Sequence, residues 1–175
     1  MKVSYNWLKQ YVDLQGVSPE ELAEKLTRSG VEVEGIEFRN KGVSQIVIGY
    51  VVEKAKHADA DKLNVCQVDV GQADRLQIVC GAKNVDSGQK IVVSLVGAQL
   101  PGGLKIKKAK LRGVESQGMI CSAKELGMND KLLPKEQQEG ILVLPEEAVI
   151  GQDAITYLGL DDAVLELGLT PNRSD

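Results

Sequence analysis

Short β-branched runs separated by turn residues dominate the middle of this chain of 175 residues. The predicted strands span residues 46–56, 63–70, 76–80, 91–96 and 141–144. Turn residues separate them: Gly71, Gly81, Asp86-Ser87-Gly88 and Pro101-Gly102-Gly103. Residues 91–96 are almost continuously apolar, which is typical of a strand covered on both faces. Five short strands over about 100 residues favour a small Greek-key barrel such as an OB-fold, whereas an immunoglobulin-like sandwich, the alternative, would need more strands.

The segments on either side of this β-rich region have mixed helix and strand patterns. Residues 4–12 have apolar side chains at helical spacing, and a second helix begins with a Ser18–Glu21 capping box and Pro19. Alternation then predicts a strand from Val31, and residues 152–158 and 163–169 predict a short helix and a strand. We therefore predict an α+β fold with an inserted all-β domain, in which a five-stranded OB-fold barrel, residues 40–150, interrupts a small α+β domain formed by residues 1–39 and 151–175. A brief helical piece is expected near residues 122–126 of the barrel domain.

Positive charge is concentrated in one segment of an otherwise acidic chain. The formal net charge is −4, yet no acidic residue occurs between Asp86 and Glu115. Such a local cationic block is typical of a polyanion site, and nucleic acid is the predicted partner. The alternative is that these lysines only protect an exposed edge strand from pairing. The basic residues of the interval are Lys90, Lys105, Lys107, Lys108, Lys110 and Arg112.

The spacing of these basic residues predicts an irregularity in the backbone. On a regular strand, Lys105 and Lys107 share one side, while Lys108, Lys110 and Arg112 share the other. A turn or bulge at residues 107–108 would let all five side chains face one groove.

Aromatic residues are absent from the segment between Val51 and Thr156. Domains that grip single strands stack bases on aromatic side chains, so that mode of binding is not expected here. The sequence instead favours a folded RNA, contacted through its phosphates and 2′-hydroxyl groups.

Residues for catalysis or metal binding are not evident. His57 is the single histidine, and with Asp59 and Asp61 it lacks a fourth metal ligand, so a structural role in a polar turn is expected. Residues 97–103 are glycine-rich but lack the spacing of a nucleotide-phosphate loop. We predict no catalytic residue and no metal site. Buried thiols in a reducing cytosol are expected for Cys66, Cys80 and Cys121.

The ends of the chain bear on its location and partners. No apolar run approaches the ~20 residues that span a bilayer, and residues 1–7 lack the apolar core of a secretory signal, so a cytoplasmic protein without membrane contact is predicted. Residues 136–175 hold nine acidic residues and one basic residue, Arg173, which indicates either a solvated face or a surface that docks on another protein. The final residues, LTPNRSD, show no helix stop, and the chain is expected to belong to a longer polypeptide.

Several motifs resemble known tRNA-binding sequences. Residues 57–127 resemble the OB domain of free-standing tRNA-binding proteins and of methionyl-tRNA synthetases, through HADADKL (57–63), VCGAKN (79–84), GAQLPGG (97–103) and LRGVESQGMICS (111–122). The flanks MKVSYNWLK (1–9), SGVEVE (29–34) and LTPNRSD (169–175) resemble the bacterial phenylalanyl-tRNA synthetase β chain, so that the resemblance covers the whole sequence. Ala58 departs from the proline that is usual after the histidine, and should loosen that turn.

The resemblance implies a role in tRNA charging. The family enzyme is a class II synthetase, an (αβ)2 tetramer that attaches phenylalanine to tRNA with ATP and Mg2+ on its α chain. This chain would then be a non-catalytic N-terminal part of the β subunit, without a cofactor of its own, whose partners are tRNA, the rest of the β chain and the α chain. By match to the tRNA-binding family, Asn84, Ser116 and Met119 are expected to contact RNA beside the basic residues, although core packing is the alternative for Met119.

Two alternative functions follow from the same residues. A stand-alone tRNA-binding module or RNA chaperone could use the barrel, but it would not need residues 1–39 and 151–175. The barrel could also be a structural spacer within a synthetase that barely contacts RNA.

Overall fold

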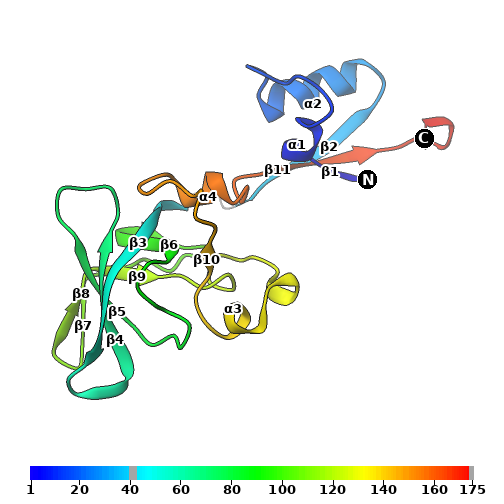
Figure 1. Cartoon of the computed structure of the whole chain (residues 1–175). Helices are drawn as coiled ribbons and strands as arrows, with labels where there is room; N and C mark the ends of the chain where they lie inside the picture. Colours follow the sequence, from blue (N-terminus) through cyan, green and yellow to red (C-terminus); the bar gives the residue numbers. More distant parts are fainter. Residues whose placement is uncertain (40–42, 174–175) are drawn as a thin grey trace. The chain divides into compact units, whose positions relative to one another are not determined.

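The computed structural model describes residues 1–39 and 43–173, which belong to two compact units (Figure 1). One unit combines residues 1–41 with 158–175, and the other spans residues 42–157. The first unit has one sheet and the second has two, and each unit has its own core.

The first unit is a three-stranded antiparallel sheet with a helix packed on it. The strand order is β1-β11-β2, and the helix α2 packs through Leu22 and Leu26 against a core that includes Leu165 and Leu167. The capping box predicted for α2 is present: Ser18 accepts a hydrogen bond from the Glu21 backbone, and the Glu21 carboxylate accepts one from the Ser18 backbone. The elements are β1 (Lys2–Ser4), α1 (Tyr5–Leu8), α2 (Pro19–Arg28), β2 (Glu32–Phe38), β11 (Ala163–Gly168) and the 3-10 helix η2 (Pro171–Arg173).

The helix predicted over residues 4–12 is much shorter than its apolar spacing indicated. Residues 2–4 pair with β11 instead, and Ser4 caps the four-residue helix α1 by accepting a hydrogen bond from the Trp7 backbone. After Leu8 the chain continues in turns, and Trp7 and Tyr11 remain exposed because nothing described within this unit covers that side. A strand upstream and the lack of a second packing surface therefore limit the helix to one turn.

The second unit is a nearly closed five-stranded barrel, which confirms the predicted OB-fold class. Four strands hydrogen-bond in the order β6-β3-β4-β5, and β9 pairs with residues 93–95 of β6 on the edge opposite β3. Gln117 lies between β8 and β9, and its backbone N–H donates to the carbonyl of Gln77 in β5 at 2.7 Å, which closes the barrel. The strands are β3 (Ser44–His57), β4 (Ala60–Asp69), β5 (Leu76–Cys80), β6 (Lys90–Gln99), β7 (Ala109–Leu111), β8 (Val114–Ser116), β9 (Gly118–Ile120) and β10 (Val143–Leu144).

The fifth barrel strand is not where the apolar pattern placed it. Residues 141–144 contribute only β10, which pairs with β6 through Val143 and Leu144. The β8–β9 segment closes the barrel, although it is rich in Ser, Gln and Gly, because side chains supply part of its hydrogen bonding to β5. The predicted helical piece at 122–126 is a single turn, in which Ser122 and Glu125 exchange hydrogen bonds.

The barrel core explains the continuous apolar run in β6. Ile91 and Val93 belong to the core cluster inside the barrel, whereas Val92 and Ser94 point to the opposite side and are also fully buried. Both faces of this strand are therefore covered, as predicted. The rest of the unit comprises the 3-10 helix η1 (Asp130–Leu132), α3 (Lys135–Glu139) and α4 (Ala154–Tyr157), and no helix of the described residues is long and apolar enough to cross a membrane.

Candidate nucleic-acid interface

The basic segment forms a hairpin of two three-residue strands, β7 and β8. Leu111 pairs with Val114, and the two residues between them both have positive φ, 50° for Arg112 and 84° for Gly113. This is the backbone of a type I′ turn, which matches the twist of the flanking strands but favours Asn and Gly over Arg. The left-handed conformation costs an L-residue about 1–2 kcal/mol, so the exposed Arg112 occupies a position that glycine, which has no Cβ, would fill with less strain.

Three charged side chains meet on one face of the hairpin. Lys110 lies directly opposite Glu115, and the Lys108 ammonium lies 2.7 Å from the Glu115 carboxylate. The two lysines are two residues apart along the chain, which places them on the same side of an extended backbone. All five predicted basic residues of this segment are exposed to solvent: Lys105, Lys107, Lys108, Lys110 and Arg112.

The backbone between the two groups of lysines belongs to no strand, and the structure assigns neither a turn nor a bulge to residues 107–108, where the spacing predicted one. Lys105 forms an isolated bridge with Gln99, and Ile106 is buried and exchanges backbone hydrogen bonds with Gly97 and Ala98. The strand β7 begins only at Ala109. Lys105 is therefore held beside the end of β6, while Lys110 belongs to the projecting hairpin and Lys108 directly precedes it.

Ser116 occupies the interior side of the hairpin and not its surface. Only 4% of this residue is exposed, and its hydroxyl accepts from the Val79 N–H at 3.1 Å and donates to the Gly118 carbonyl at 2.9 Å. These bonds fasten the end of β8 to β5. A close approach follows at Gly118, where an added Cβ would lie 2.6 Å from the Ser94 carbonyl oxygen.

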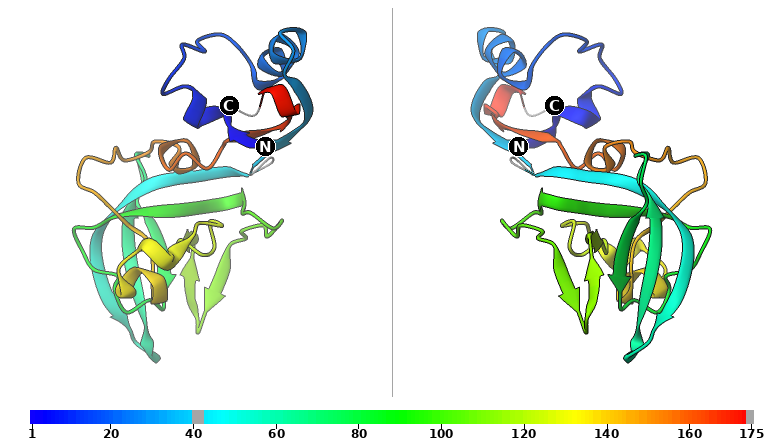
Figure 2. Two further views of the ribbon diagram at one scale, coloured as in Figure 1. Left: turned by 90° about the vertical axis from the view of Figure 1, so that its right-hand side faces the viewer. Right: turned by 90° about the vertical axis from the view of Figure 1, so that its left-hand side faces the viewer.

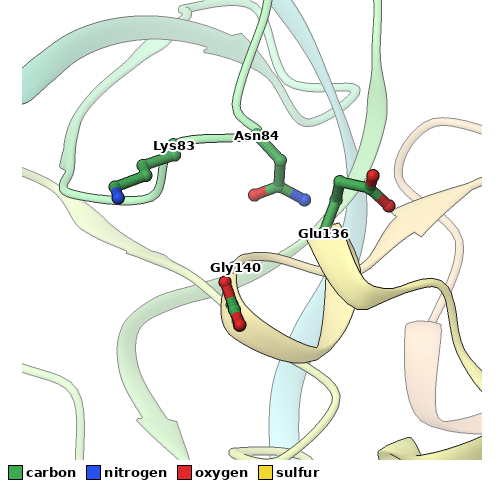
Figure 3. Close-up of a pocket in the computed structure, with 5 residues that line it drawn as sticks. Lys83, Asn84, Glu136 and Gly140 are labelled. Carbon is green, nitrogen blue, oxygen red and sulfur yellow. The ribbon is translucent and has the colours of Figure 1, made fainter.

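Asn84 is also engaged with the backbone of its own unit. Its amide nitrogen donates to the Ile141 carbonyl, and its amide oxygen accepts from the Ile141 N–H, both at 2.9 Å. Figure 3 shows the amide directed toward Gly140, between Lys83 and Glu136, in a pocket of about 210 Å³. Gly140 is required there, since an added Cβ would lie 2.0 Å from the amide oxygen. Asn84 therefore fastens the loop after β5 to the segment before β10.

Met119 faces a groove beside the hairpin. Its neighbours Gly118 and Ile120 face the barrel interior, so Met119 points outward from β9. It lines a groove of about 450 Å³ together with Leu111, Val79 and Glu125. The side chain is half-buried and stands outside the barrel core cluster, in reach of a ligand that contacts the hairpin.

His57 is a further residue of this region that sequence reasoning assigned only to a polar turn. It is 4% exposed, and its Nε2 lies 2.9 Å from the Leu111 carbonyl oxygen, at the tip end of β7. No spacing rule could have identified this pair, because 54 residues separate the two positions.

The cysteines are buried and carry strongly perturbed pKa values. Burial raises the pKa of the Cys66 thiol to about 11 and that of Cys121 to about 12, and it also raises the pKa of Cys80. The Cys121 sulfur lies 2.7 Å from the Ser94 hydroxyl, inside the unit. Thiols in such surroundings are protonated at neutral pH and are poor nucleophiles. Within residues 1–39 and 43–173, no group of three His, Cys, Asp or Glu side chains is placed to hold a metal ion.

The sequence of this chain matches a known protein family. A family model described as a putative tRNA binding domain matches residues 46–153, which include the barrel strands and the basic hairpin. The chain belongs to this family.

Curated relatives extend the match over the whole chain. The phenylalanine–tRNA ligase β subunit of Bacillus licheniformis is 62% identical over all 175 residues, and that of Bacillus subtilis is 61% identical over the same length. These alignments confirm the resemblance to the β subunit. They cover 22% of each relative, so the chain spans about a fifth of their length. Among solved structures, the C-terminal domain of Plasmodium vivax p43 aligns with a TM-score of 0.44 and 24% identity, over 61% of this chain and 56% of that one.

Proposed function

We propose that this chain is the N-terminal, non-catalytic part of a phenylalanine–tRNA ligase β subunit, and that its barrel binds tRNA. The observation that carries the proposal is an exposed basic hairpin on a barrel of a tRNA-binding family, in a chain that matches these β subunits along its whole length. A stand-alone tRNA-binding module is less well supported, because residues outside the barrel match the β subunits as well.

The residues divide into those that contact RNA and those that position the contacts. Phosphates are bound by the exposed side chains of the basic segment, namely Lys105, Lys107, Lys108, Lys110 and Arg112. Met119 provides an adaptable apolar contact in the adjacent groove. Ser116 and Asn84 act mainly through the backbone that they hold, since their polar atoms already have partners inside the unit.

The chemistry belongs to the rest of the enzyme. We infer a class II ligase in which the catalytic α chain binds ATP and Mg2+, and an (αβ)2 tetramer in the cytoplasm. In that assembly, the present chain assists tRNA binding and performs no reaction itself. Domains of the β chain beyond these residues, and the α chain, are its protein partners.

Salt dependence of tRNA binding tests the proposal. Affinity of the 175-residue chain for tRNA(Phe) transcript is measured by fluorescence anisotropy between 50 and 200 mM salt. If four or five phosphates are neutralised, log affinity falls with a slope of about −3 against log salt, and K107A/K108A/K110A weakens binding and flattens this slope. The control K2A/K9A/K25A removes the same charge from the other unit and should leave the slope unchanged.

Two results would contradict the proposal. Absence of binding at 50 mM salt would support the structural-spacer alternative for the barrel. Equal losses in K107A/K108A/K110A and in the control would show that RNA responds to net charge and not to the hairpin.

A further inference from the structure

The tip of the basic hairpin is fastened to the barrel by a side chain from another turn. His57 ends β3, at the two-residue turn that leads into β4, and it is buried. Its Nε2 lies 2.9 Å from the carbonyl oxygen of Leu111, the residue immediately before Arg112. Figure 2 shows the yellow-green hairpin and the β3–β4 turn projecting toward the same end of the barrel.

The hydrogen bond at the second ring nitrogen fixes the tautomer of this imidazole. The backbone N–H of Asp59 lies 3.0 Å from His57 Nδ1. A backbone N–H can only donate, so Nδ1 must be the unprotonated acceptor. In the neutral ring the proton therefore resides on Nε2, which donates to the Leu111 carbonyl. Both nitrogens of a buried ring are thus satisfied by two different turns.

The hairpin needs an anchor at its tip because its own strands are very short. Its base is held to β5: Gln77 Nε2 donates to the Glu115 carbonyl, and Ser116 Oγ accepts from the Val79 N–H. β7 pairs with β8 alone in the strand ladders, and a two-stranded hairpin is only marginally stable by itself. Among the described residues, the bond from His57 is the one side-chain hydrogen bond that ties β7 to the barrel.

We propose that His57 is a positioning residue for RNA binding. Through the Leu111 carbonyl it holds Lys110 and Arg112 at a fixed place on the surface, so that the β3–β4 turn and the basic hairpin act as one binding element. This inference rests on the proposed function, namely that the hairpin contacts tRNA. His57 itself is too deeply buried to contact the RNA phosphates.

Two amide substitutions separate the two hydrogen bonds of the imidazole. In H57Q the amide nitrogen takes the place of Nε2 and can still donate to Leu111, whereas in H57N the amide oxygen replaces Nδ1 and only the bond from Asp59 remains. We expect H57N to weaken tRNA binding about fivefold to tenfold and to lower the magnitude of the salt slope by about 1, as for the loss of one phosphate contact. H57Q should stay within about twofold of the wild type.

A measurement without RNA tests directly whether His57 holds the hairpin through its hydrogen bond to Leu111. Backbone hydrogen exchange in residues 109–116 should quicken in H57N and remain near wild type in H57Q, while exchange in residues 76–80 stays unchanged in both. In the wild-type protein, imidazole ¹⁵N shifts should show a proton on Nε2 and none on Nδ1, and this measurement requires no variant to fold.

The outcomes distinguish this inference from the proposed function. Unchanged exchange of residues 109–116 in H57N, or a proton on Nδ1 in the wild type, would show that the hydrogen bond from His57 to Leu111 does not hold the hairpin. The positioning role would be overturned if H57N and H57Q lost tRNA affinity equally and in proportion to the drop in their thermal unfolding midpoints. His57 would then serve only the stability of the fold. If the exchange results are as expected but the wild type does not bind tRNA, the proposed function fails and the RNA role of His57 fails with it.

Discussion

Glu115 places a negative charge among the positive side chains of the hairpin. It faces Lys110 across the strands and forms an ion pair with Lys108, and both partners of that pair are partly exposed. An exposed ion pair of this kind contributes about 0–1 kcal/mol to folding. Its larger effect is on the local field, because the carboxylate opposes the approach of phosphates.

Replacement of this carboxylate should strengthen RNA binding. We expect E115Q to raise affinity for tRNA about threefold at 100 mM salt and to change the free energy of unfolding by less than about 1 kcal/mol. Anisotropy titration and urea unfolding measure the two quantities. The control E20Q removes an equal charge from an exposed position in the other unit. Weaker binding in E115Q, or an equal gain in E20Q, would contradict the assignment of this face.

The buried thiols predict a loss of stability at alkaline pH. Their pKa values lie above the ordinary value of about 9 in the native protein, so above that pH the unfolded chain loses protons that the native chain retains. The free energy of unfolding therefore falls as pH rises from about 9 to 12, by about 1 kcal/mol for each of Cys66 and Cys121 by pH 10.

Urea unfolding at pH 8, 9 and 10 checks this prediction. The comparison is between the wild type and C66A/C121A, because titration of lysines and tyrosines is common to both proteins. The variant should lose less stability over this range. Equal losses in the two proteins would show that the thiols ionise normally in the native state.

At the scale of elements, the β7–β8 hairpin combines a demanding turn with a long charged side chain. The two turn residues have left-handed backbones, and Gly113 accepts this conformation without a Cβ clash whereas Arg112 does not. Such a residue persists where the surrounding structure holds it in place, and this is frequent at binding sites. The turn is therefore less stable than it would be with glycine at position 112, but it presents a guanidinium at this point of the surface.

Substitution of Arg112 should separate these two contributions. We expect R112G to raise the free energy of unfolding by up to about 1 kcal/mol, since the turn strain is relieved, and to weaken tRNA binding about threefold. R112K serves as the matched control, because it keeps both the positive charge and the strained backbone. Its free energy of unfolding and its affinity for tRNA should both stay near those of the wild type. Lower stability in R112G would show that the turn is unstrained at this residue.

At the scale of the whole molecule, local sequence patterns predicted the individual helices and strands better than the way in which the strands close into a barrel. The capping box at Ser18, the strand β5 and the covered strand β6 follow from nearest neighbours and periodicity, and all three are present. The strand that closes the barrel was not predicted, because Gln77 and Gln117 bond across 40 residues through a backbone bond and a side-chain bond that leave no apolar pattern. Tertiary pairing likewise shortened α1.

The same limit applies to the candidate site. Composition located the charged segment. It could not show that the polar atoms of Ser116 and Asn84 are hydrogen-bonded to the backbones of Val79 and Ile141. Nor could it show that His57 and Leu111 meet. Hydrogen-bond partners far apart in the chain depend on the closed barrel, and no local rule specifies them.

We expect tRNA to bind on the hairpin side of the barrel. Hydrogen exchange of the intact chain with and without tRNA(Phe) transcript tests it most directly, at a salt concentration where anisotropy shows saturation. We predict slower exchange in residues 105–119 and unchanged exchange in residues 19–38 of the other unit. Saturated binding that leaves residues 105–119 unprotected, or protection confined to residues 19–38, would contradict binding of tRNA at the hairpin.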